Sequence, residues 1–163
     1  MKRLFISAIV LILVIPLART AFDAPAAKAA AQLRRLPING SMQSTEAYDL
    51  KFMTMAVNAN GSGTATQFGQ FTIAYQGQVD FSDLSTTESA RLTASNGDRL
   101  DLTGVGQATQ STKPSIFNIV QIYKVTGGTG QYAKASGTIT LHRIINIASG
   151  LTSATFDGYI LIP

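Results

Sequence analysis

The strongest constraint on the fold is an alternation of apolar and polar residues with a period of two along residues 65–81. Its odd positions carry most of the apolar side chains, and its even positions are mostly Thr and Gln. Because successive side chains of a β-strand point to opposite faces, the pattern predicts a strand with one buried face and one solvent-exposed face. Phe71, Ile73 and Tyr75 lie on the buried face, and we expect them to line any ligand site inside the fold.

Similar runs recur along the chain, whereas no run of comparable length shows helical periodicity with caps. Asn96-Gly97 joins two such runs and predicts a tight hairpin, and Asn60-Gly61 and Ser149-Gly150 are further turn candidates. Evenly spaced strands with tight turns predict an all-β sandwich or a closed antiparallel barrel. The eight expected strands are 38–45, 50–57, 64–79, 88–95, 98–107, 116–126, 136–147 and 152–162.

Residues 1–31 have the pattern of a targeting segment. Lys2 and Arg3 precede the apolar stretch Leu4–Leu17, which is short for a membrane span, and small-x-small cleavage patterns follow it. We expect a signal helix that is either cleaved as a signal peptide or kept as an N-terminal anchor, which would then be the only contact with a membrane. This leaves a single β-barrel domain over 36–163 and predicts a secreted or periplasmic protein.

Composition excludes several classes of function. Without residues 1–31 the chain keeps nine basic and eight acidic residues, a net charge of about +1 with no dense basic patch. Nucleic-acid binding, which needs such a patch, is therefore not expected. Cysteine is absent, so disulfides, zinc–cysteine sites and thiol nucleophiles are excluded. With one histidine and scattered carboxylates, we expect neither a metal site nor a cofactor.

The segment Gly128–Ala133 matches the pattern G-x-G-x-x-A, which can mark a dinucleotide-binding turn. That reading requires a helix directly after the glycines and an acidic residue about 20 positions later. Here Ser136 follows and strand alternation resumes, so a turn between two strands is favoured. The expected structural turn motif, in which the tyrosine closes the barrel end, comprises Gly127, Gly128, Gly130, Tyr132 and Gly137.

Two residues are candidates for catalysis. His142 lies on a polar strand face, where a surface position is favoured over a general base. Asp80 lies at a strand end, where a solvent-exposed loop position is favoured over a catalytic role. On the opposite face to His142, Arg143 interrupts an apolar run over 139–147. Strand 116–126 is apolar on both faces, which indicates either cover on both sides or a subunit contact.

The run from Val125 to Tyr132, followed by Gly137 and the pair Leu141-His142, resembles the allene oxide cyclase barrel-like family. That family is related to plant dirigent proteins, which carry a similar glycine run, and the chain looks like a small exported bacterial-type member. The resemblance covers roughly 36–162. It implies an eight-stranded antiparallel barrel that is often a trimer.

Function follows less directly from this resemblance. Plant cyclases hold a fatty-acid epoxide in an apolar lumen with a cysteine that this chain lacks, and dirigent proteins use aspartates near a segment like that of Asp80. We expect an exported barrel that binds a small apolar ligand or a protein partner without catalysis. The alternative is an allene-oxide-cyclase-like or dirigent-like enzyme or template that holds one substrate conformer in the lumen.

Overall fold

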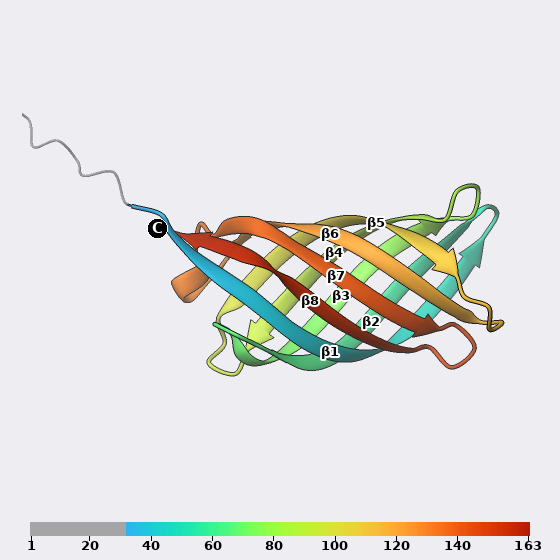
Figure 1. Ribbon diagram of the computed structural model, residues 1–163, viewed down its shortest axis with the longest axis horizontal. Coiled ribbons are helices and arrows are strands. Elements are labelled where there is room, and N and C mark those ends of the chain that lie inside the picture. The colour runs from blue at the N-terminus through green and yellow to red at the C-terminus, as the bar shows by residue number, and fades with distance from the viewer. Residues whose placement is uncertain (1–31) are drawn as a thin grey trace, which may run out of the picture. The chain divides into compact units, whose positions relative to one another are not determined.

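The computed structural model describes residues 32–163, which form a closed barrel of eight antiparallel strands joined in chain order (Figure 1). Each strand pairs with the next one along the chain, and β1 pairs with β8 to close the barrel. The fold class expected from the sequence is therefore confirmed. The strands are β1 (Arg34–Lys51), β2 (Thr54–Ala65), β3 (Gly69–Asp80), β4 (Ser85–Ala94), β5 (Arg99–Gln110), β6 (Ile116–Gly128), β7 (Ser136–Asn146) and β8 (Leu151–Ile162).

The barrel has two ends with different loops. At the terminal end, Arg34 of β1 pairs with Ile162 of β8, so the barrel domain begins and finishes at the same end (Figure 1). The loops of the terminal end are 66–68, 95–98 and 129–135, and those of the opposite, distal end are 52–53, 81–84, 111–115 and 147–150.

Inward side chains fill the barrel because the strands alternate between buried and exposed residues. A large apolar cluster extends through most of the interior, from Tyr132 near the terminal end to Val79 near the distal end. A small cluster of Ala108, Ile119 and Ile145, with Tyr48, Leu84 and Phe117 packed against it, occupies the distal end. We call this second cluster the distal plug. Small eight-stranded barrels have interiors just wide enough for such side chains to fill.

Three sequence expectations about turns need correction. The expected strands 38–45 and 50–57 place a turn at 46–49, but β1 continues to Lys51 and the turn lies at 52–53. The expected strand 64–79 is two strands, because a turn at 66–68 with Gln67 at φ +66° separates β2 from β3. Asn60-Gly61 is no turn and lies within β2. Gly61 is there because a Cβ would overlap the backbone of the neighbouring strand β1. The hairpin at Asn96-Gly97 and the turn at Ser149-Gly150 are confirmed.

The glycine-rich motif forms a corner between β6 and β7. A single 3-10 turn, Gly130–Tyr132, separates these two strands, as expected for strand–turn–strand geometry. Gly130 has φ +57°, and a Cβ there would overlap the Asp98 carboxylate. Tyr132 is fully buried: its ring packs 4.8 Å from Phe68, and its hydroxyl donates to the Gln67 carbonyl over 2.5 Å. The tyrosine thus closes the terminal end of the barrel.

The expected signal helix falls on residues 1–31, outside the described part of the chain. Within residues 32–163, no helix is long and apolar enough to cross a membrane.

Candidate functional site: a buried ionic network and an outer groove

Three charged side chains meet inside the barrel. Arg143 of β7 donates to Glu88 of β4 over 2.6 Å and to Glu46 of β1 over 3.3 Å. Each of the three side chains is at most 3% exposed. Buried charges are rare unless they are paired, so this network is the most unusual feature of the interior.

Neutral groups complete the hydrogen bonding of both carboxylates. The Tyr75 hydroxyl donates to Glu46 over 2.5 Å, and Thr152 donates to the same oxygen over 2.7 Å. The Tyr123 hydroxyl donates to Glu88 over 2.5 Å. Charge-assisted bonds of this kind are short and about twice as strong as neutral ones. Each carboxylate is therefore bound by the protein's own phenol as well as by Arg143.

Burial and charge shift the acid–base behaviour of the network. Burial alone disfavours the charged Arg143 guanidinium, but the two carboxylates outweigh this effect and raise its pKa. Burial, together with the glutamates they contact, also raises the pKa of the hydroxyls of Tyr48, Tyr75 and Tyr123. At neutral pH the guanidinium is charged and all three phenols keep their protons.

Alkaline pH should therefore destabilise the barrel. The pKa of these three phenols is above 10.0 in the folded chain, so their stabilising effect is complete below pH 10 and is lost as pH rises towards the folded pKa. The largely buried Tyr75 and Tyr123 should each cost about 1.4 kcal/mol per pH unit in that range, and the partly exposed Tyr48 should cost less because water screens it. Denaturant unfolding at several pH values, followed with tyrosinate absorbance, measures this. If the absorbance showed that all tyrosines ionise before the chain unfolds, this prediction would be contradicted.

The interior leaves almost no room for a ligand. The cavity bordered by Phe71 and Ile73 has a volume of about 20 Å³, enough for one water molecule. Tyr75, the third residue expected to bind a ligand, faces inward, where its hydroxyl contacts Glu46 and Ser44. Within residues 32–163, the only buried side-chain nitrogen or oxygen without a hydrogen-bond partner is Arg143 Nε. The polar groups of the network thus bond to one another, and the interior leaves no room for a substrate beside them.

The two candidate catalytic residues lie on separate strands and outside this network. Asp80 ends β3 at the distal end, where it accepts hydrogen bonds from the backbone and hydroxyl of Ser82. These bonds lower the pKa of its carboxyl, as in an ordinary turn. His142 of β7 is exposed on the outer surface. The structure does not bring the two residues together at a common site, and their catalytic role remains a prediction.

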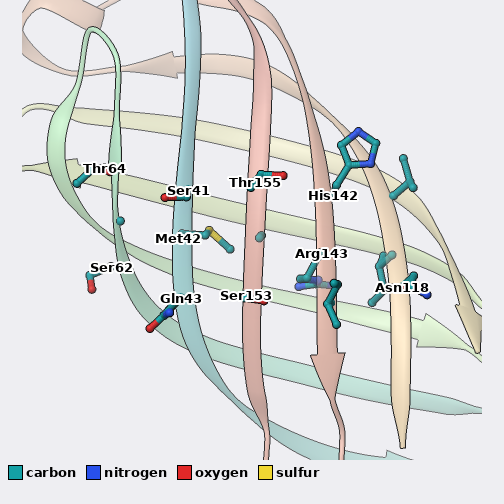
Figure 2. A pocket seen from close by; sticks show the side chains of 15 residues that line it. Ser41, Met42, Gln43, Ser62, Thr64, Asn118, His142, Arg143, Ser153 and Thr155 are labelled. Atoms are coloured by element: carbon teal, nitrogen blue, oxygen red, sulfur yellow. The ribbon is translucent and has the colours of Figure 1, made fainter. Parts of the chain in front are cut away.

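His142 lies in a shallow groove of about 650 Å³ on the outside of the barrel (Figure 2). The groove crosses five strands, β2, β1, β8, β7 and β6, and its outward side chains are uncharged. In Figure 2 hydroxyl and amide groups are spread over the neighbouring strands, and Asn118 and His142 lie on the β6–β7 side of the groove. The labelled outward residues are Ser41, Gln43, Ser62, Thr64, Asn118, His142, Ser153 and Thr155.

Beside the groove, β5, β6 and β7 expose large apolar side chains. Val105 pairs directly with Ile122, and Val120 lies two residues along the same face of β6. Ile144 of β7 and Val120 also border the groove. We call Val105, Val120, Ile122 and Ile144 the outer patch; each is at least 47% exposed. Strand 116–126 is thus apolar on both faces because one face fills the barrel and the other forms this patch.

Sequence reasoning missed the carboxylates of the network, although a signal for them was present. Glu88 is in phase with the inward Ala90 and Leu92 on β4, and Glu46 is in phase with the inward Met42 on β1. Arg143 likewise interrupts an inward apolar face. A charged residue at an inward position of a strand is therefore the pattern that identifies this network.

No group of three or more His, Cys, Asp or Glu side chains within residues 32–163 is placed to hold a metal ion. No protein-family model matches the chain. No curated protein matches it significantly either. Among solved structures, a pterocarpan synthase dirigent protein is similar in fold, with a TM-score of 0.60 and 11% sequence identity over 88% of this chain and 98% of the other. The chain therefore has a dirigent-like barrel fold.

Proposed function

We propose that the protein is an exported, non-catalytic, dirigent-like barrel that binds a protein partner through its outer surface. The observation that carries this proposal is the contrast between a filled interior, with a cavity of about 20 Å³, and the exposed outer patch. Sites for small molecules are usually concave, mostly apolar and several hundred Å³ in volume. Export rests on the pattern of residues 1–31.

The first partner to consider is a second copy of the chain. The outer patch lies on three adjacent strands, and the uncharged groove extends the same face over β8, β1 and β2. A stable protein–protein interface needs about 800 Å² on each side, with an apolar core and a polar rim. The patch supplies such a core, and the hydroxyl and amide groups of the groove supply such a rim.

A lysine at the centre of the outer patch should disrupt this assembly. We expect the wild-type chain to form an oligomer in solution and Ile122→Lys to shift it to the monomer, because the interface would have to bury an unpaired charge. Light scattering coupled to size exclusion measures the mass. Asn58→Lys, on β2 across the barrel from β6, adds the same charge as a control and should leave the mass unchanged. A monomeric wild-type chain would contradict self-association.

The alternative function is a dirigent-like template that steers the coupling of phenolic radicals. The observation that favours it is the pair of interior carboxylates that bind phenol groups, Glu46 with Tyr75 and Glu88 with Tyr123. A substrate phenol would have to displace one of these tyrosines. Coupling of a monolignol-type phenol by an added one-electron oxidant, with the chain present, tests it by the enantiomeric composition of the product. Our proposal expects a racemic product, and an enantiomeric excess would support the alternative.

A further inference from the structure

The turn between β1 and β2, at the distal end, carries the most exposed aromatic side chain among residues 32–163. Phe52 is 94% exposed, and Leu50 beside it is 71% exposed. The backbone N–H of Phe81, in the turn between β3 and β4, donates to the Met53 carbonyl over 2.9 Å. This bond joins the two turns, and we call the exposed apolar side chains of these turns, together with Leu50 near the end of β1, the distal tip: Leu50, Phe52, Met53 and Phe81.

The residue types in this turn are unusual for its backbone conformation. Lys51 pairs with Thr54, so Phe52 and Met53 form a two-residue loop, and Met53 has φ +62°. Glycine or asparagine is strongly preferred at such a position. Leu84 in the neighbouring turn has a similar φ, but its side chain packs against the distal plug. Met53 is half exposed and belongs to no core cluster, so folding alone does not explain the choice of Phe-Met.

We propose that the distal tip inserts into the interface of a lipid bilayer with zwitterionic headgroups, a membrane contact beyond the one expected from residues 1–31. The uncharged groove extends the outer patch over three further strands, whereas the distal tip has charged neighbours such as Asp49 and Lys51. Its four side chains alone cannot supply the 20–30 residues that a stable protein–protein interface uses on each side. A bilayer needs no matching surface, because the acyl-chain boundary deforms around a convex apolar tip, and binding scales with the apolar area that is buried.

The charges around the tip select the headgroup. Asp49, Asp80 and Asp83 lie at the distal end with Lys51 and Lys113. Lys51 lies 3.9 Å from Asp49, so one of the two cations is already partly neutralised. Attraction to anionic lipids depends on clusters of four or more basic residues, and this end has an excess of carboxylates. Zwitterionic lipid is therefore the favoured surface.

Fluorescent labelling at single cysteines tests the proposal in the full chain, because the natural sequence has no cysteine. An environment-sensitive dye at Leu50→Cys should shift to the blue with phosphatidylcholine vesicles and be quenched by a quencher inside the bilayer. The same dye at Asn96→Cys, on the terminal end, should remain in water. Residues 1–31 are common to both variants, so a difference reports on the barrel. A dye at position 50 that stays in water, as for a tip that binds only protein, would overturn the proposal.

A turn variant separates membrane binding from folding. Phe52→Ser with Met53→Gly gives the turn the residue that its backbone prefers and removes the projecting ring. We expect an equal or higher Tm together with a fall of about tenfold or more in affinity for phosphatidylcholine vesicles. Unchanged affinity would overturn the proposal. A several-fold gain in wild-type affinity on adding phosphatidylglycerol would overturn the choice of headgroup.

Discussion

Replacing Arg143 with Met is expected to lower the free energy of unfolding by about 3–5 kcal/mol, because it leaves Glu46 and Glu88 buried without a counter-charge. Methionine has a suitable volume, so the loss would come from charge and hydrogen bonding more than from a cavity. Denaturant unfolding measures the effect. An unchanged midpoint with an unchanged slope would show that the network does not hold the barrel together.

Two variants serve as controls for this prediction. Arg91→Met removes a guanidinium that also lies 2.6 Å from a carboxylate, that of Asp101, but on the surface, with side chains 55% and 37% exposed. We expect a loss below about 1 kcal/mol there, because water screens exposed pairs. Adding Glu46→Gln and Glu88→Gln to Arg143→Met should recover much of the lost stability, since removing a whole buried network costs less than removing one partner.

Replacing Tyr132 with Ala should have an effect of similar size, about 3–5 kcal/mol. Its ring is 1% exposed and packs against Phe68, so truncation opens a cavity where the glycine-rich corner closes the terminal end of the barrel. Tyr132→Phe keeps the ring and loses only the bond to the Gln67 carbonyl, which should cost about 1 kcal/mol. Equal losses in the two variants would show that the hydroxyl, and not the ring, closes this end.

Local sequence rules predicted most of the barrel correctly because strand alternation and hairpin chemistry act between near neighbours. The run that contains Phe71 and Ile73 faces inward as expected, and Asn96-Gly97 makes its hairpin. The same rules failed at Gly61, where the glycine allows close contact with β1, a strand that the sequence does not identify as a neighbour. They also failed at 66–68, where Gln67 takes a conformation usually reserved for glycine.

The network could be predicted only in part, because local rules do not identify neighbours that are distant in the sequence. Alternation marks Glu46, Glu88 and Arg143 as inward residues on three strands. It does not show that they meet, because Arg143 is 55 residues from Glu88 and 97 from Glu46. Their contact needs the register of every pair of strands and the closure of β1 on β8.

By itself, the sequence determined that this chain is all-β, which side of most strands faces inward, and where several of its turns lie. These properties depend on residues two to four positions apart. Only the tertiary structure decided that the interior is filled and holds a paired ionic network, and that apolar side chains remain outside at the outer patch and the distal tip. Burial and charge pairing are properties of the closed barrel, in which distant strands share one interior.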